Sequence, residues 1–275
     1  MKYPKFLINS VRKKSYDANS LPMPVNTVCV EAKCPNRGEC FSKKTVTFLL
    51  LGNICTRNCG FCNIAKGKPE SSPIDEREAI IETIKHFGLK YVVLTSVTRD
   101  DLKDGGASVF VSVMKAIRTY NPTIKIEVLV PDFKYNYDSI NLVCNENPFV
   151  FNHNLELAPR IFSTYRPMGN FDKSLEILDY VKRHYANIHI KTGIMVGLGE
   201  TKKEILELIE LLRKKEIDSL TIGQYLQPNK SLAEIKRFVS PEEYLEYEQA
   251  GRDFGIKVIA GPLVRSSYMA ENIFN

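Results

Sequence analysis

Six of the seven cysteines lie between residues 29 and 62, where they form two groups of three. The first group has the spacing C-x4-C-x5-C and the second has C-x3-C-x2-C, and neither matches the paired C-x2-C of structural zinc sites. A closed iron–sulfur cube needs four ligands, so each site must recruit a different fourth ligand or leave one iron open for chemistry. The sequence therefore predicts two metal clusters, one on Cys29, Cys34 and Cys40 and one on Cys55, Cys59 and Cys62.

Zinc is the competing interpretation of these cysteines. A zinc site usually closes with a fourth Cys or His nearby, and the nearest candidate, His86, lies inside a predicted helix. A binding module in which zinc only holds loops together therefore stays the alternative from a different functional class. It predicts a colourless protein containing zinc, whereas iron–sulfur clusters predict a brown, oxygen-sensitive one.

Composition limits the class of protein. With 275 residues, 44% hydrophobic and 25% charged, the chain can form one large α/β domain with short extensions. It has no run of about 20 apolar residues and no apolar signal core at its start, and its clustered cysteines fit reduced thiolates, so we expect a cytoplasmic protein without membrane contact. The net charge of +6 comes from dispersed Lys and Arg, which argues against nucleic-acid binding but suits an acidic protein partner.

From residue 45 onward, apolar runs rich in β-branched residues alternate with amphipathic stretches of helical period. This pattern is typical of βα units on a parallel sheet, with the active site where the strands end. Strands are predicted at 45–51, 90–95, 125–130, 149–152, 188–196 and 219–223, and helices at 74–86, 107–120, 171–185, 202–215 and 241–254. A strand-like KVIAG follows the last helix.

Three parts are expected along the chain. Residues 1–44 contain several prolines and little periodicity, so we expect this extension to be held by its metal and by packing across the barrel mouth. Residues 45–240 form the βα barrel, and residues 241–275 form a C-terminal extension.

The loop CTRNCGFC, placed directly after the first strand, resembles the cluster loop of the radical S-adenosylmethionine (SAM) superfamily. The resemblance implies an α/β fold, a partial (βα)6 TIM-like barrel, and a [4Fe-4S] cluster whose open iron chelates the amino and carboxylate groups of SAM. One electron from the reduced cluster then cleaves the sulfonium to give a 5′-deoxyadenosyl radical. By the same resemblance Phe61 flanks the adenine, although the residue alone also fits a core position.

Other residues gain expected roles from this resemblance. The stretch GIMVGLGE matches the motif G-x-I-x-G-x-x-E, with Met195 in the isoleucine place and Gly197 in the turn, and it supports the adenosine. Asn154 and Glu156, after the fourth strand, are expected to bind a ribose or amino acid moiety. Arg166 either holds the cofactor carboxylate or forms a surface salt bridge. The loop of Arg99, Asp100 and Asp101 either contacts the methionine amino group or is an exposed charged turn.

The first cysteine group and the C-terminal RSSY resemble the lipoyl synthase family, as do IEVLVPDF, VFNHNLE, KTGIMVGLGET and LTIGQYLQP. The resemblance implies an auxiliary [4Fe-4S] cluster on Cys29, Cys34, Cys40 and a serine, with Ser267 preferred over Ser266. It also implies sulfur insertion at C6 and C8 of an octanoyl chain on a lysine of a lipoyl carrier domain. That carrier is a 2-oxoacid dehydrogenase E2 subunit or the glycine cleavage H protein.

The resemblance further implies an electron donor such as flavodoxin or ferredoxin and an iron–sulfur carrier. A methylthiotransferase or a biotin synthase relative is the alternative within the superfamily. The chain departs from the family pattern at Phe6, Phe41, Met269 and residues 229–237, which bears on substrate or partner docking. Cys144 stands apart from both groups and is expected to be a buried small hydrophobe.

Overall fold

The computed structural model describes residues 4–5, 7, 23–42, 45–69, 75–268 and 270–272. They fall into two compact units. The N-terminal unit comprises the described residues of 14–58 and 63–152, and the C-terminal unit those of 1–13, 59–62 and 153–275. The cysteine loop, residues 55–62, thus contributes Cys55 to the first unit and Cys59 and Cys62 to the second. The three-part division at residues 44 and 240 stays a prediction.

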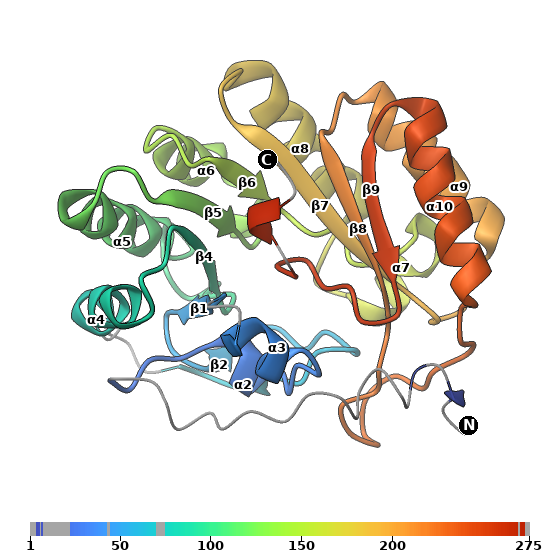
Figure 1. The fold of residues 1–275 in the computed structure, drawn as a ribbon, viewed down its shortest axis with the longest axis horizontal. Coiled ribbons are helices and arrows are strands. Elements are labelled where there is room, and N and C mark those ends of the chain that lie inside the picture. The colour runs from blue at the N-terminus through green and yellow to red at the C-terminus, as the bar shows by residue number, and fades with distance from the viewer. Residues whose placement is uncertain are drawn as a thin grey trace. The chain divides into compact units, whose positions relative to one another are not determined.

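Four parallel strands form the centre of the N-terminal unit, and three helices cover them (Figure 1). The strands are mostly apolar and almost wholly buried, as expected when both faces of a parallel sheet are covered. Helix α5 begins after Gly106, which has a φ of +92°, and helix α4 ends at Gly88, which has a φ of +62°. In sheet order the strands are β1 (Thr47–Leu50), β4 (Tyr91–Ser96), β5 (Lys125–Leu129) and β6 (Val150–Asn152), and the helices are α4 (Arg77–Phe87), α5 (Ala107–Tyr120) and α6 (Tyr137–Cys144).

Short elements in this unit carry three of the clustered cysteines, Cys29, Cys40 and Cys55. Two short helices precede the first strand, a two-residue strand ends at Cys55, and a second one pairs with it in parallel. A 3₁₀ turn follows β5. These elements are α2 (Val28–Glu31), α3 (Arg37–Ser42), β2 (Ile54–Cys55), β3 (Ala65–Lys66) and η2 (Phe133–Tyr135).

The C-terminal unit repeats the same βα arrangement with three parallel strands. Helix α9 opens with a capping box, in which Thr201 and Glu204 satisfy each other's backbone amides. Helix α10 opens with Ser240 as N-cap and proline at its first turn. The strands are β7 (His189–Val196), β8 (Ser219–Gln224) and β9 (Lys257–Gly261), and the helices are α7 (Pro159–Tyr165), α8 (Phe171–His184), α9 (Lys202–Lys214), α10 (Pro241–Phe254) and η3 (Ala270–Asn272).

All six predicted strands and the strand-like KVIAG are present, with ends shifted by at most a few residues. The predicted helices at 107–120 and 241–254 have the observed bounds, and the helix expected at 74–86 is described from Arg77. Short helices α2, α3, α6 and α7 were not predicted. Helices α2 and α3 form within the N-terminal extension although its sequence shows little periodicity.

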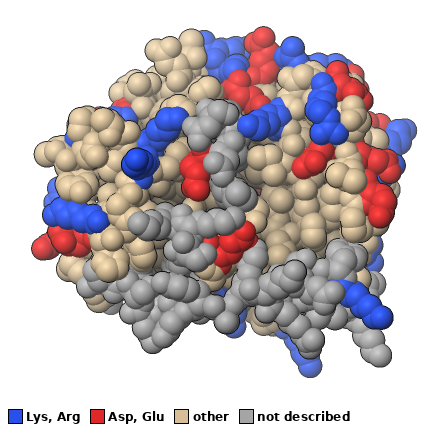
Figure 2. Space-filling view, in the orientation of Figure 1, with Lys and Arg blue, Asp and Glu red and all other residues tan. Residues whose placement is uncertain are grey.

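No helix among the described residues is both long and apolar enough to cross a membrane. On the face shown in Figure 2, Lys and Arg are interspersed with Asp and Glu. Phe6, Met269 and the start of the helix expected at residue 74 lie outside the described residues.

Candidate functional site

The first cysteine group is built on two short helices joined by a tight turn. Cys29 lies buried in α2, Cys40 lies in α3, and Cys34 lies between them. The amide of Cys34 donates to the carbonyl of Cys29 at 3.2 Å, and Lys33 enters the left-handed region with a φ of 51°. None of the three is in a disulfide, as metal ligation requires.

This segment is fastened to the rest of the N-terminal unit. The carbonyl of Asn26 accepts from the amide of Leu49, and its side chain donates to Glu76 at 3.0 Å. Glu76 also accepts from the amide of Leu51 at 3.0 Å; burial raises its pKa, although both donors oppose that shift. Asn63, the residue after Cys62, donates to the carbonyl of Glu31 at 3.0 Å. The helix that carries Cys29 thus contacts the residue that follows the cysteine loop.

The front of the cysteine loop is held by strand pairing and a sulfur contact. The carbonyl of Cys55, at the end of β2, accepts from the amide of Gly67 at 3.0 Å. The amide of Arg57 lies 3.4 Å from Sγ of Cys55 and donates to it. Together these contacts hold both the backbone and the sulfur of Cys55 in place.

A buried ion cluster fixes Arg57 in the same loop. Its guanidinium donates to both oxygens of Asp100, at 2.8 and 2.9 Å, and to both oxygens of Asp132, one of them at 2.7 Å. Burial opposes the charge, but the two aspartates leave the pKa of Arg57 above the ordinary arginine value. Thr56 adds a bond to the carbonyl of Thr98 at 3.0 Å. The loop is thereby tied to the ends of β4 and β5.

Asp132 is itself placed by an unusual turn. The three residues after it, Phe133, Lys134 and Tyr135, have φ values of 45°, 55° and 61°. Each left-handed residue of this kind costs about 1–2 kcal/mol, and such strain clusters at functional sites. Asp132 stabilises the turn by accepting from the amide of Lys134 at 3.0 Å.

The loop of Arg99, Asp100 and Asp101 is only partly exposed. Arg99 is 1% exposed and pairs with the exposed Asp101 at 2.8 Å, while Asp100 pairs with Arg57. Cys144 is buried in α6, as predicted, and burial raises the pKa of its thiol.

The back of the cysteine loop belongs to the C-terminal unit. Gly60 lies between Cys59 and Cys62. The amide of Gly60 donates to the carbonyl of Tyr165 at 2.7 Å, and the carbonyl of Gly60 accepts from the amide of Ala233 at 2.8 Å. Phe61 is half-buried, so its adenine role stays a prediction.

Four of the residues expected at the cofactor lie together in the C-terminal unit. The backbone of Glu156, with a φ of 69°, bonds to Gly193 and to Met195 at 2.9 and 2.8 Å. Its carboxylate accepts from Asn154 at 3.2 Å, and Arg166 donates to the carbonyl of Asn154 at 3.3 Å. Burial raises the pKa of Glu156 against the opposing effects of Arg166 and Asn154. Arg166 is buried, so the surface salt bridge is wrong.

Glycines make room for this group. A Cβ on Gly193 would lie 2.7 Å from Oγ1 of Thr221 and 2.9 Å from Oδ1 of Asn154. A Cβ on Gly223 would lie 2.1 Å from the carbonyl oxygen of Val264. Both strands must therefore carry glycine for the segment after β9, which includes the two serines, to pack here.

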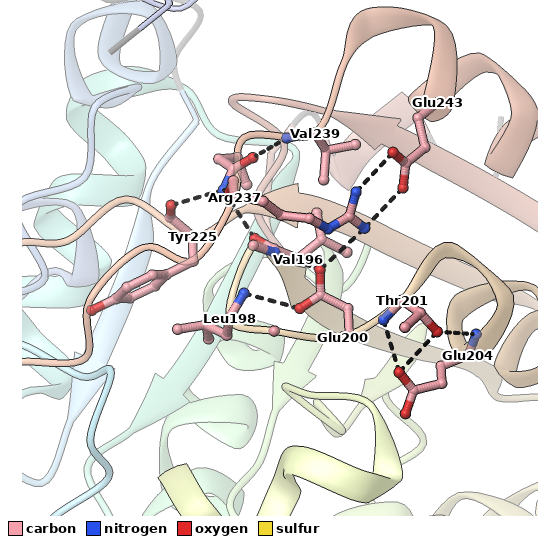
Figure 3. A network of polar contacts seen from close by, with 12 residues as sticks. Val196, Leu198, Glu200, Thr201, Glu204, Tyr225, Arg237, Val239 and Glu243 are labelled. Atoms are coloured by element: carbon pink, nitrogen blue, oxygen red, sulfur yellow. Dashed lines mark hydrogen bonds and ion pairs between the residues drawn. The ribbon is translucent and has the colours of Figure 1, made fainter. Parts of the chain in front are cut away.

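The glycine turn, residues 197–200, is closed by its own glutamate. Gly197 and Gly199 have φ values of 100° and 112°. The buried carboxylate of Glu200 accepts from the amides of Gly197 and Leu198 at 2.7 and 2.9 Å (Figure 3). This accounts for the glutamate at the end of the G-x-I-x-G-x-x-E pattern.

Neighbouring serines in RSSY differ in their contacts. The hydroxyl of Ser266 donates to Oδ1 of Asn154 at 2.7 Å, whereas Ser267 is half-buried and forms no hydrogen bond with the residues that the structure describes. Sequence reasoning did not identify Arg57, Asp132, Tyr165 or Arg237. Many of their partners lie far away along the chain, and the charge inside the cysteine loop was the one local signal for Arg57.

The residues present fit the expected groups chemically. None of the six clustered cysteines is in a disulfide, five of them are half-buried, and Glu156 and Arg166 offer opposite charges to an amino acid. Among the described residues, however, no three His, Cys, Asp or Glu side chains are gathered closely enough to hold a metal ion. Both cluster ligand sets and the cofactor contacts therefore stay predictions.

Known proteins resemble the chain over most of its length. The Radical SAM superfamily profile matches residues 49–212. Lipoyl synthase of Caldicellulosiruptor bescii is 50% identical over 249 residues, 90% of this chain and 86% of that protein. Lipoyl synthase of Caldanaerobacter subterraneus subsp. tengcongensis is 47% identical over 269 residues, 95% of this chain and 94% of that protein.

Among solved structures, Streptococcus suis SuiB bound to S-adenosylmethionine superposes with a TM-score of 0.61. The match covers 82% of this chain and 53% of that chain at 10% identity, so it concerns the fold alone. Together with the parallel βα units, it confirms the expected radical SAM type of α/β fold. From the superfamily match and the two relatives, the chain belongs to the lipoyl synthase family of the Radical SAM superfamily.

Proposed function

We propose that the chain inserts two sulfur atoms into a protein-bound octanoyl group, at C6 and C8, to form the lipoyl cofactor. Membership of the superfamily implies a [4Fe-4S] cluster and SAM, and membership of the family implies an octanoylated carrier protein as substrate. The observation that carries the proposal is the presence of two separate groups of cysteines, none of them in a disulfide, on a fold of the radical SAM type.

Each cysteine group has its own role in this proposal. Cys55, Cys59 and Cys62 would hold the cluster that binds SAM, and Cys29, Cys34, Cys40 and Ser267 would hold an auxiliary [4Fe-4S] cluster. When bound, these groups supply the electron, the 5′-deoxyadenosyl radical that removes hydrogen from unactivated methylenes, and the inserted sulfur.

Ser267 is preferred because its neighbour is already engaged. The Ser266 hydroxyl donates to Asn154, which leaves Ser267 as the serine of RSSY that is open to ligate iron. A hydroxyl is a weaker iron ligand than a thiolate. A labile fourth ligand suits a cluster whose sulfide is consumed.

The protein's own residues place SAM. Glu156 and Arg166 would face its amino and carboxylate groups or the ribose, with Asn154 fixing both by hydrogen bonds. Met195 and Gly197 would support the adenosine and Phe61 would flank the adenine. The contacts of Arg57 hold the first half of the cysteine loop, and those of Gly60 hold its second half.

Protein partners follow from the same chemistry. The substrate would be a lipoyl domain of a 2-oxoacid dehydrogenase E2 subunit or glycine cleavage H protein. Flavodoxin or ferredoxin would supply electrons, and an iron–sulfur carrier would rebuild the auxiliary cluster.

Metal analysis of the anaerobically reconstituted chain tests the cluster assignment. We expect about eight irons per chain, falling to about four in both Cys29→Ala and Cys55→Ala. With SAM and dithionite, Cys29→Ala should still release 5′-deoxyadenosine and Cys55→Ala should not. The proposal would be contradicted by stoichiometric zinc in place of iron. It would also be contradicted if Cys29→Ala, and not Cys55→Ala, lost the 5′-deoxyadenosine product.

A further inference from the structure

Residues 229–237, where the chain departs from the family pattern, form an irregular but well-bonded connection between β8 and α10. We name this stretch the bridging segment. Asn229 accepts from the amide of Ser231 at 2.9 Å, and Gln227 donates to the carbonyl of Leu232 at 2.8 Å. The first half of the segment is therefore folded by its own contacts.

The second half joins two parts of the candidate site. The amide of Ala233 donates to the carbonyl of Gly60 in the cysteine loop at 2.8 Å. Three residues later, the amide of Lys236 donates to the carbonyl of Gly197 in the glycine turn at 2.8 Å. One short piece of backbone thus links the loop that carries Cys59 to the turn that is expected to support adenosine.

Tyr165 makes a parallel link between the same two parts. Its carbonyl accepts from the amide of Gly60 at 2.7 Å, and its hydroxyl donates to the carbonyl of Leu198 at 3.0 Å. Gly60 and the glycine turn are therefore connected twice. The cysteine loop, the bridging segment, the glycine turn and Tyr165 together close a ring of hydrogen bonds. In such a ring neither part can shift without straining both links.

Arg237 anchors the bridging segment in this ring (Figure 3). Its guanidinium donates to both oxygens of Glu243, at 2.8 and 2.9 Å, and lies 3.4 Å from the buried carboxylate of Glu200. Its carbonyl accepts from the Gln224 side chain at 3.1 Å. The hydrogen bonds to Glu243 contribute most to raising the pKa of Arg237 above the ordinary arginine value. A planar guanidinium spans two carboxylates in a way that a lysine ammonium does not.

We propose that Arg237 is a positioning residue that keeps the cysteine loop and the glycine turn in register by holding the bridging segment between them. The proposal rests on the proposed function of that loop and turn as the SAM site. It gives the segment of atypical sequence a structural role within the site itself.

Substitution of Arg237 should loosen one link directly and the other indirectly. In Arg237→Gln, Glu200 keeps its two backbone donors but loses its counter-charge, and Glu243 loses both of its arginine hydrogen bonds. The Tyr165 link keeps its own donors and acceptors but loses the support of the second link, so it opens more often. The expected change is therefore local opening around Gly60 and Gly197 in a chain that still folds.

Hydrogen exchange on the reconstituted full-length chain tests this without requiring turnover. In Arg237→Gln we expect exchange of the Gly60 and Leu198 amides to rise about tenfold, together with that of Ala233 and Lys236. The matched control is Arg183→Gln, which removes an ion pair between the exposed Arg183 and the half-buried Asp179 in α8. A rise confined to residues 229–239, with Gly60 and Leu198 unchanged, would overturn the proposal.

SAM affinity gives the second readout. We expect Arg237→Gln to weaken binding of SAM about tenfold while iron content stays at the wild-type value, and Arg237→Lys to recover part of the loss. Glu243→Gln should add little in the Arg237→Gln background, because it acts through the same guanidinium. Unchanged affinity for SAM in Arg237→Gln would overturn the positioning role. Failure of the wild type to form 5′-deoxyadenosine would instead count against the proposed function, and the hydrogen-exchange result would still stand.

Discussion

The hydroxyl of Ser266 donates to Oδ1 of Asn154 at 2.7 Å and so joins residues 112 positions apart in the sequence. The contact fixes the RSSY segment beside the residues that follow β6. Because the same Asn154 also donates to Glu156, the segment is coupled to the candidate cofactor site. Ser266 and Ser267 should therefore play different roles despite their adjacency.

Paired substitutions distinguish the two serines. Ser267→Ala should destabilise the auxiliary cluster, because it removes the proposed fourth ligand, and iron content after reconstitution should fall toward about four per chain. Ser266→Ala should keep the iron and weaken SAM binding through Asn154. Loss of iron in Ser266→Ala with normal content in Ser267→Ala would reverse the assignment.

Asp132→Asn tests the ion cluster that holds the cysteine loop. The change leaves Arg57 buried with a single charged partner, and breaking a buried pair typically costs about 3–5 kcal/mol of folding free energy. The urea midpoint should fall accordingly. Asp75→Asn, which breaks an exposed pair with Arg77, serves as the control and should leave the midpoint unchanged. Equal midpoints for the two variants would show that the buried cluster contributes no stability.

Gly223→Ala tests the packing of the RSSY segment. The added Cβ would lie 2.1 Å from the carbonyl oxygen of Val264, a backbone atom that can move only with its segment. We expect displacement of the two serines and loss of auxiliary iron. Gly261→Ala, on the neighbouring strand, places its Cβ 3.2 Å from a flexible side-chain methyl of Val264 and should be milder. The packing account is contradicted if Gly223→Ala retains full iron.

The start of α9 gives a pH-dependent prediction. Hydrogen bonding from Arg160, aided by Thr201, lowers the pKa of Glu204 to about 2. A lowered pKa in the folded state contributes stability above the unfolded value of about 4.3, and that stability is lost as the pH falls toward 2. Glu204→Ala should therefore cost about 1 kcal/mol at pH 7 and progressively less below pH 4. Urea unfolding at several pH values checks this, and a constant difference would contradict it.

Local signals made much of the fold predictable. Helix α5 was predicted with its observed bounds, because its apolar period runs from the glycines before Ala107 to Asn121 and Pro122. The cysteine groups stand out by spacing alone. Helices α6 and α7 were not predicted, since elements of eight and seven residues show too few turns for a clear period.

Contacts between distant residues were not predictable in this way. Arg57 meets Asp100 and Asp132, which lie 43 and 75 positions away, only because parallel strands bring their carboxyl ends to one edge. In the sequence alone, Asp100 fitted an exposed turn equally well. Arg237 likewise meets Glu200 through tertiary folding. Its other partner, Glu243, is six positions away, but no local pattern marks the pair as part of a network.

Mass spectrometry of an octanoyl-lysyl lipoyl domain tests the central claim most directly. The domain is incubated anaerobically with the reconstituted chain, SAM and dithionite, and we expect it to gain two sulfurs and lose two hydrogens. Cys29→Ala should make 5′-deoxyadenosine but leave the octanoyl chain without sulfur. If the wild-type chain forms 5′-deoxyadenosine and the octanoyl group stays unchanged, sulfur insertion into this substrate is contradicted.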